Sequence, residues 1–189
     1  QYRFLYEFDQ VPYEAGTLKA VGYNVQGIEL SNYSIETAGD PDHLLLTKLE
    51  NPLGWKADGA DVALVQVEVV DKQGRRCPLD NRTVRFSLCG EGEWRGGIAQ
   101  GKDNDVLSDS LEVECGVNRV MLRSTTKAGE VTLKASADGL KSQTISFHTN
   151  SVKVVNGLST DLPSDGLRSV LDRGQTPNTP SFVPSAVDI

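Results

Sequence analysis

The sequence predicts an all-β protein built from β-sandwiches. Apolar and polar residues alternate in short runs, most clearly over Val62–Asp71, and a period of two is typical of a half-buried strand. Turn residues such as Asp138-Gly139 separate these runs, and such dipeptides favour β-hairpins. No segment shows the 3.6-residue period of an amphipathic helix.

The first 53 residues predict an incomplete sandwich. Strands are expected over Arg3–Phe8, Thr17–Tyr23, Tyr33–Thr37 and the apolar run Leu44–Leu46, with a hairpin tip at Asn24–Gly27. These are roughly four strands, whereas an immunoglobulin-like sandwich uses about seven. We therefore expect 1–53 to be the C-terminal part of an immunoglobulin-like domain that begins before residue 1.

Residues 54–149 predict a complete immunoglobulin-like β-sandwich. Val65, Val67 and Val69 share one strand face, whereas Val62 and Leu64 lie on the opposite one. A bulge between them would let the strand bend or cross between two sheets. The other inward faces are expected to be Val84, Phe86 and Leu88; Leu111, Val113 and Cys115; Val131, Leu133 and Ala135; and Ile145 and Phe147. Trp55 is expected to pack between the two sandwiches.

Residues 150–189 change in character. Gly, Pro, Ser, Thr, Asn and Asp dominate, as in Thr176–Pro180, which is typical of a linker. We expect an irregular, extended connector, with disorder as the alternative.

Charge and hydropathy exclude two classes of partner. The chain has 26 acidic and 19 basic residues, a net charge of −7, whereas a nucleic-acid binder usually carries a basic excess or stripe. No apolar run reaches the roughly 18 residues of a membrane span. The start, Gln1–Phe4, has neither an initiator Met nor a signal pattern, so the chain is expected to be a piece of something longer.

Three segments in order carry a family resemblance. They are Pro12–Ala20 (PYEAGTLKA), Thr37–Pro41 (TAGDP), and Asp58–Asp61 (DGAD) leading into Val65–Asp71. Together they resemble the region after the catalytic barrel in glycoside hydrolase family 2, in particular the β-galactosidase-like enzymes of Bacteroides-type bacteria. The resemblance covers about residues 10–149. One departure is the stretch Gly96–Asn104, where relatives often carry Asn-Gly-Asp.

The resemblance implies a non-catalytic role for this chain. Family members hydrolyse β-glycosides with retention through two glutamates about 5 Å apart, on a (β/α)₈ barrel of about 250 residues. This chain has neither the strand–helix alternation nor the Asn-Glu dipeptide that marks the acid/base. We therefore expect no catalytic residue and no cofactor here, in a parent that is a glycosidase.

The expected partners follow from the same resemblance. They are the catalytic barrel and other domains of the same parent protein, with an oligosaccharide as a further ligand, in the periplasm or at the bacterial cell surface. A carbohydrate-binding module and an immunoglobulin-like adhesion or spacer domain are the alternatives.

Acidic clusters are the first candidate sites. Glu112 and Glu114 lie on one strand face about 7 Å apart, but a solvated face explains them better than a catalytic pair. Asp103-Asn104-Asp105 with Asp109 is a loose set of Ca²⁺ ligands without the EF-hand spacing, so a solvated loop is favoured and no metal is expected. His148 is expected on the surface.

Trp94 and Arg95 are the predicted carbohydrate-binding residues. They lie in Gly90–Asp105, which its five glycines predict to be a loop. Sugar rings stack on exposed indoles, so Trp94 is expected to be the anchor and Arg95 a hydrogen-bond donor. The alternative is that Trp94 caps the core of the sandwich.

The cysteines predict separate thiols. Three cysteines is an odd number, so at least one is unpaired within the chain. The alternation predicts that Cys115 points inward and Cys89 outward, which favours a buried and a surface thiol over a disulfide.

Overall fold

The regular structure of the protein consists of strands. The computed structural model describes residues 7–49, 51–100, 103–155 and 158–159, and no helix occurs in these ranges. The strands are β1 (Thr17–Tyr23), β2 (Glu29–Glu36), β3 (His43–Leu49), β4 (Trp55–Ala57), β5 (Val62–Val70), β6 (Thr83–Gly90), β7 (Gly92–Gln100), β8 (Asp103–Val106), β9 (Ser110–Glu112), β10 (Val117–Ser124), β11 (Glu130–Ser136), β12 (Gln143–Ser151), β13 (Val154–Val155) and β14 (Leu158–Ser159). The all-β prediction is confirmed.

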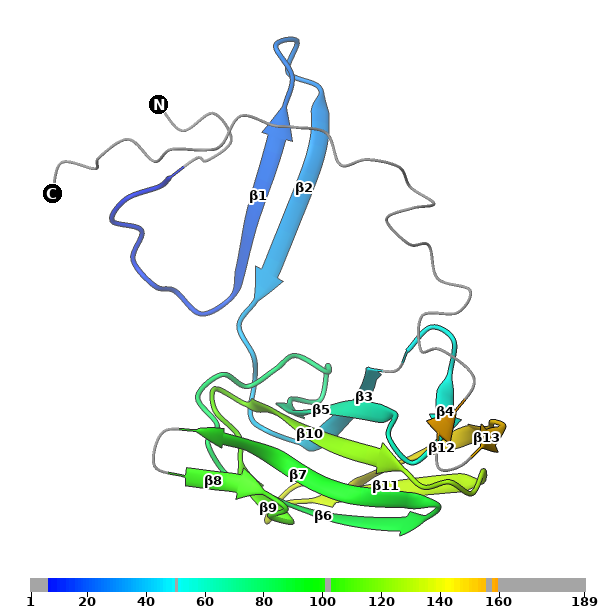
Figure 1. Cartoon of the computed structure of the whole chain (residues 1–189). Helices are drawn as coiled ribbons and strands as arrows, with labels where there is room; N and C mark the ends of the chain where they lie inside the picture. Colours follow the sequence, from blue (N-terminus) through cyan, green and yellow to red (C-terminus); the bar gives the residue numbers. More distant parts are fainter. Residues whose placement is uncertain (1–6, 50, 101–102, 156–157, 160–189) are drawn as a thin grey trace, which may run out of the picture.

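Two five-stranded sheets pack face to face as a β-sandwich (Figure 1). One has the order β3-β5-β10-β7-β8 and the other the order β4-β12-β11-β6-β9. Neighbouring strands are antiparallel, apart from β4, which runs parallel to β12. The predicted sandwich is therefore present.

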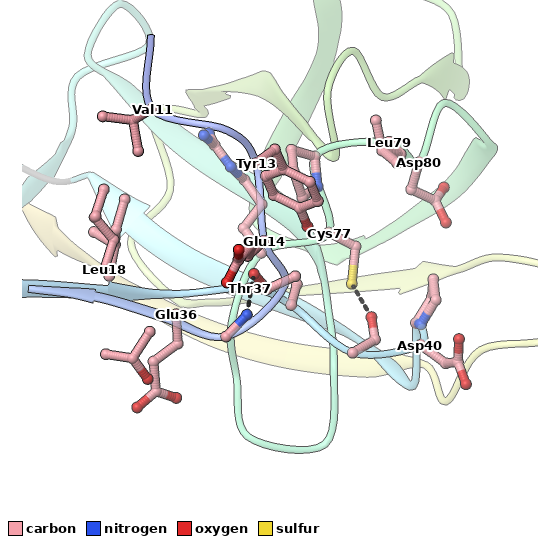
Figure 2. Close-up of a pocket in the computed structure, with 18 of the residues that line it drawn as sticks. Val11, Tyr13, Glu14, Leu18, Glu36, Thr37, Asp40, Cys77, Leu79 and Asp80 are labelled. Atoms are coloured by element: carbon pink, nitrogen blue, oxygen red, sulfur yellow. Dashed lines mark hydrogen bonds between the residues drawn. The ribbon is translucent and has the colours of Figure 1, made fainter. Parts of the chain in front are cut away.

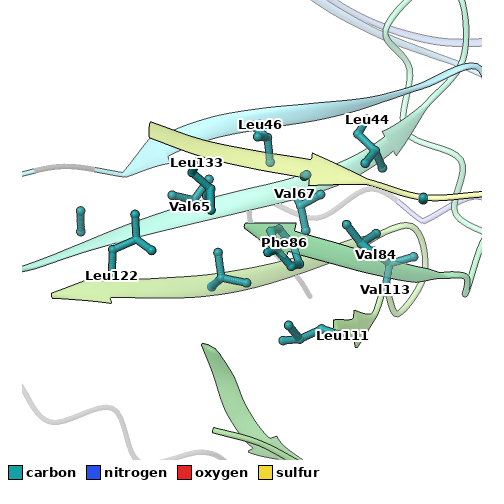
Figure 3. Packing of buried hydrophobic residues seen from close by; sticks show 14 of the residues in the cluster. Leu44, Leu46, Val65, Val67, Val84, Phe86, Leu111, Val113, Leu122 and Leu133 are labelled. Atoms are coloured by element: carbon teal, nitrogen blue, oxygen red, sulfur yellow. The ribbon is translucent and has the colours of Figure 1, made fainter. Parts of the chain in front are cut away.

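The core lies between the sheets and follows the predicted alternation (Figure 3). Val65, Val67 and Val69 are each 0 % exposed, because every second residue of a strand faces the same side. Buried residues from the opposite sheet meet them; they are Val84, Phe86, Leu111, Val131, Leu133, Ala135 and Phe147. Leu88 and Ile145 are partly buried against this core, so these inward faces are confirmed.

Strand β5 is regular, which corrects the predicted bulge. It pairs with β10 and with β3 without a register shift. Ala63 takes the next inward position and is 1 % exposed, whereas Val62 on the other face is 43 % exposed. The apolar residue at Val62 therefore does not mark a change of face.

The sandwich begins at β3, on the N-terminal side of the predicted boundary at residues 53 and 54. Strand β3 pairs with β5 along its full length, from His43 opposite Val70 to Leu49 opposite Leu64. Leu44 and Leu46 are buried in the shared core. The apolar run Leu44–Leu46 predicts a strand, but the pairing that assigns this strand to the sandwich is non-local. Whether the residues before β3 form a domain of their own stays a prediction.

Trp55 lies inside the sandwich, which corrects its predicted place between two sandwiches. Its side chain is 2 % exposed, and its ring meets Phe147 edge to face with centroids 5.5 Å apart. The indole N–H donates to the carbonyl of Asp61 at 3.1 Å. Trp55 is therefore a core residue at the start of β4.

The glycine-rich segment forms strands β7 and β8, which corrects the predicted loop. At Gly90 (φ 98°) the chain leaves β6 and crosses to β7 in the other sheet. A Cβ on Gly92 would lie 2.9 Å from Cγ1 of Val131, and a Cβ on Gly97 would collide with Cδ2 of Leu111. These glycines therefore permit close packing between the two sheets.

Strands β1 and β2 form a separate hairpin that projects away from the sandwich (Figure 1). The predicted strand Thr17–Tyr23 and the tip at Asn24–Gly27 are both confirmed. The Asn24 side chain accepts hydrogen bonds from the backbone of Gln26 and Ile28, each at 2.9 Å. Of the predicted strand Arg3–Phe8, residues 1–6 lie outside the described residues, and 7–8 are not in a strand.

The described part of the predicted linker is short. Strand β12 runs on to Ser151, and β13 pairs with β14. Residues 156–157 and 160–189 lie outside the described residues.

Candidate functional site

The β1–β2 hairpin has one apolar face. Its register places Leu18 opposite Ile35 and Ala20 opposite Tyr33, and directly opposed residues share a face. Leu18 is 62 %, Tyr33 72 % and Ile35 50 % exposed. We call this surface, made of Leu18, Ala20, Tyr33 and Ile35, the apolar face of the hairpin.

The opposite face of the hairpin is mainly polar. Lys19 lies opposite Ser34, and Thr17 lies opposite Glu36. An alternation of apolar and polar residues is typical of a ribbon with one face on a core and the other in water. In the described part of the chain, however, no element covers the apolar face.

A cleft of about 1290 Å³ separates the base of the hairpin from the sandwich (Figure 2). The segment before β1 forms one wall of the cleft with Val11 and Tyr13. The loop between β5 and β6 forms another wall with Leu79. Tyr13 and Leu79 are 81 % and 95 % exposed. Leu18 and Ile35 belong both to the cleft and to the apolar face, so the two surfaces are continuous.

Asp71 joins the hairpin to the sandwich. It follows β5, is 1 % exposed, and accepts hydrogen bonds from the backbone N–H of Gly39 at 2.8 Å and from Nε of Arg75 at 2.8 Å. Arg75 also donates from Nη1 to Glu36 at the end of β2, at 2.8 Å. No local sequence pattern predicts this junction, because Gly39 and Asp71 are 32 residues apart.

The hydrogen bonds of Asp71 determine its protonation. Burial opposes its ionisation, but the N–H groups of Gly39 and Arg75 outweigh burial and hold the pKa of the Asp71 carboxyl well below its usual range. In turn, the pairing with Asp71 raises the pKa of Arg75. The junction is therefore charged at neutral pH.

Asp71→Asn is expected to lower the thermal midpoint of the chain by several degrees at pH 7. The amide keeps the shape but loses the charge that Arg75 and Gly39 bind. Because the folded-state pKa is depressed, this stabilisation is present above the unfolded-state pKa of about 3.9 and is lost as the pH falls further. Thermal unfolding of both proteins from pH 7 to pH 3 should therefore show a difference that shrinks below about pH 4.

Asp138→Asn is the matched control for this prediction. Asp138 is an exposed partner of Arg85, and exposed ion pairs contribute little. A difference between wild type and Asp71→Asn that is the same at every pH would contradict the electrostatic account of the junction.

Trp94 lies on β7, half-buried against the core. Its ring packs on Phe86 with centroids 5.4 Å apart, and its indole N–H donates to the carbonyl of Ser108 at 2.9 Å. Arg95, the next residue, is partly exposed. Carbohydrate binding by Trp94 and Arg95 stays a prediction.

The acidic candidates do not come together in a cleft. Glu112 and Glu114 are exposed, as the solvated-face interpretation predicts. Within the described ranges, no group of three or more His, Cys, Asp or Glu side chains is placed to hold a metal ion. His148 is exposed, as expected.

The thiols are arranged differently from the prediction. Cys77 is the buried one, and burial raises the pKa of its thiol. Cys115 is exposed at the turn after β9, with φ 53°, so the inward alternation ends at Val113. Cys89 is exposed, as predicted.

In the part of the chain that the structure describes, no helix has the length and hydropathy of a membrane span.

Known proteins are similar to this chain in sequence and fold. Over 85 % of this chain, the sequence is 42 % identical to a beta-glucuronidase of Formosa agariphila. Over 70 % of this chain, it is 31 % identical to a beta-galactosidase of Bacteroides ovatus. A solved structure of a beta-glucuronidase from glycoside hydrolase family 2 matches 84 % of the chain with a TM-score of 0.75 and 42 % identity. The chain spans 16 %, 15 % and 16 % of these three proteins, respectively.

The family itself is identified by residues 51–146. They match the model of the glycoside hydrolase family 2 C-terminal domain 5, which covers β4 to β12 up to Ser146 and so most of the sandwich. This agrees with the resemblance carried by the three sequence segments. The chain belongs to the glycoside hydrolase family 2 C-terminal domain 5 family.

Proposed function

We propose that the chain is a non-catalytic C-terminal module of a family 2 glycoside hydrolase that supports the catalytic barrel. The observation that carries the proposal is the match of the sandwich to a C-terminal domain of this family, in a chain that spans about one sixth of its relatives. The space between its two sheets is filled by an apolar core. In the described residues, the interior of the sandwich is therefore a packed core and not a substrate cleft, which supports a structural role.

The parent protein is proposed to hydrolyse β-glycosides with retention. The relatives named above are a beta-glucuronidase and a beta-galactosidase. The higher identity to the beta-glucuronidase favours a β-glucuronide as the substrate of the parent. Retaining hydrolysis needs two carboxyl groups about 5 Å apart, which are proposed to lie on the barrel.

The 189-residue chain alone is expected to show no turnover of aryl β-glucuronides or aryl β-galactosides above the uncatalysed rate. The natural polypeptide that contains this chain serves as the positive control. Steady-state release of the aryl alcohol is the measurement. Turnover by the chain alone that is lost in Glu112→Gln or Glu114→Gln would contradict a non-catalytic role.

We also propose a periplasmic or cell-surface location for the parent. This rests on the family resemblance, and fractionation of the source cells with an antibody against the sandwich tests it.

A further inference from the structure

The apolar face of the hairpin has no partner in the described part of the chain. Leu18, Tyr33 and Ile35 are at least half exposed, whereas the charged residues Lys19 and Glu36 of the same strands lie on the other face. A two-stranded hairpin is marginally stable in water unless a further layer packs on it. The pattern is therefore that of one half of a sandwich.

We propose that the apolar face of the hairpin is a docking surface for a second β-sheet layer of the same polypeptide, contributed by a region outside this chain. This deepens the proposed function, on which it rests, by naming the surface through which the module packs on its neighbour.

The chemistry of the surface fits a sheet. The face carries Leu18, Ala20, Tyr33 and Ile35 and no charged residue, as the inner face of a sandwich does. Strand β2 has 8 residues, which at about 3.4 Å each give a strand roughly 27 Å long. A strand of this length is ordinary for a sheet of a globular domain.

The sandwich of this chain is not the partner. Thr37 donates its N–H to the carbonyl of Gly16 at 2.8 Å, and Gly16 donates to Oγ1 of Thr37 at 3.0 Å, which closes the base of the hairpin. The bonds of Asp71 and Arg75 then hold this base on the turn after β5. The hairpin is thereby fixed so that it projects away from the sandwich (Figure 1).

The outer surface of the sandwich differs from the apolar face of the hairpin, because it carries charged side chains. Its outward residues include Arg85 on β6, Arg119 on β10 and Lys134 on β11, all exposed. The partner layer is therefore expected to come from outside the described sandwich.

A region of the same polypeptide is favoured over a second copy of the chain. The matched beta-glucuronidase is about six times as long as the segment it shares with this chain, because that segment is 16 % of its length. A second copy would bring together two chains that each carry a net charge of −7, and like net charges repel.

The variants Tyr33→Asp and Ser34→Asp test the two faces of β2 separately. Tyr33 is on the apolar face, whereas Ser34 is on the polar face opposite Lys19. In the natural longer polypeptide, Tyr33→Asp is expected to lower the thermal midpoint of the hairpin-containing transition by at least about 5 °C, and Ser34→Asp to leave it unchanged. In the 189-residue chain, both variants should unfold like the wild type, since both positions are exposed there.

Hydrogen exchange of the unmodified proteins is the second measurement, and it decides the matter if Tyr33→Asp does not fold. The amides of β1 and β2 are expected to exchange at least about 100-fold more slowly in the longer polypeptide than in the 189-residue chain. Equal exchange in the two proteins, or equal effects of the two variants, would overturn the proposal. So would a dimer of the 189-residue chain that Tyr33→Asp dissociates, since a second copy would then be the occupant. None of these outcomes depends on turnover, so a failure here is distinct from a failure of the proposed function.

Discussion

Replacing Trp55 with alanine is expected to lower the free energy of unfolding by about 3–5 kcal/mol. The side chain is 2 % exposed and packs edge to face on Phe147, so its removal leaves a large cavity. The carbonyl of Asp61, which accepts the indole N–H, also accepts a hydrogen bond from the backbone of Ser124 at 2.9 Å. The loss is therefore due mainly to the cavity and not to an unpaired acceptor.

Urea denaturation of the 189-residue chain measures this effect, with Trp94→Ala as the matched comparison. Trp94 is half-buried, so its replacement is expected to cost less than that of Trp55. A loss below about 1 kcal/mol for Trp55→Ala, as at an ordinary surface site, would show that Trp55 is not a core residue.

Gly90→Ala is expected to lower the free energy of unfolding by at least about 3 kcal/mol. Gly90 has φ 98°, and a Cβ there would collide with the carbonyl oxygen of Glu130. That oxygen accepts a hydrogen bond from the N–H of Glu91 at 3.0 Å. The backbone segments around Gly90 and Glu130 therefore cannot separate without losing this hydrogen bond at the crossing from β6 to β7.

Gly74→Ala is the matched control for Gly90→Ala. Gly74 also has a positive φ, 78°, but no heavy atom lies within 4 Å of its added Cβ. It should therefore show only the cost of the backbone conformation, about 1–2 kcal/mol. Equal losses in the two variants, measured by urea denaturation, would contradict the predicted collision.

Strand positions were predictable because alternation is a local property. Thr17–Tyr23 is a strand with the predicted bounds, and Val131, Leu133 and Ala135 are each 0 % exposed. For Val131, Leu133 and Ala135, the period of two also reports directly which side chains face the core.

Pairing between distant segments was not predictable. The run Leu44–Leu46 predicts a strand, but only its ladder with β5 shows that it belongs to the sandwich. Glycine content was ambiguous for a different reason: a glycine permits a loose loop, but it also permits close approach of backbones, as at Gly92 and Gly97. Cys115 was misplaced because alternation ends where the chain turns.

The junction and the apolar face differ in how far sequence could have revealed them. The bond from Gly39 to Asp71 spans 32 residues, and no local pattern signals it. The apolar face was detectable, since Leu18, Ala20, Tyr33 and Ile35 already alternate with polar neighbours. The sequence alone does not give the register of the two strands, which places their apolar residues on the same face of the hairpin.

A crystal structure of the natural longer polypeptide that contains this chain would show directly whether the hairpin packs on a neighbouring domain. The quantity to measure is the exposed fraction of Leu18, Tyr33 and Ile35. All three are expected to be buried against a sheet of a neighbouring domain, with the sandwich packed outside the catalytic barrel. Side chains that remain as exposed as the 62 %, 72 % and 50 % found here would contradict this expectation.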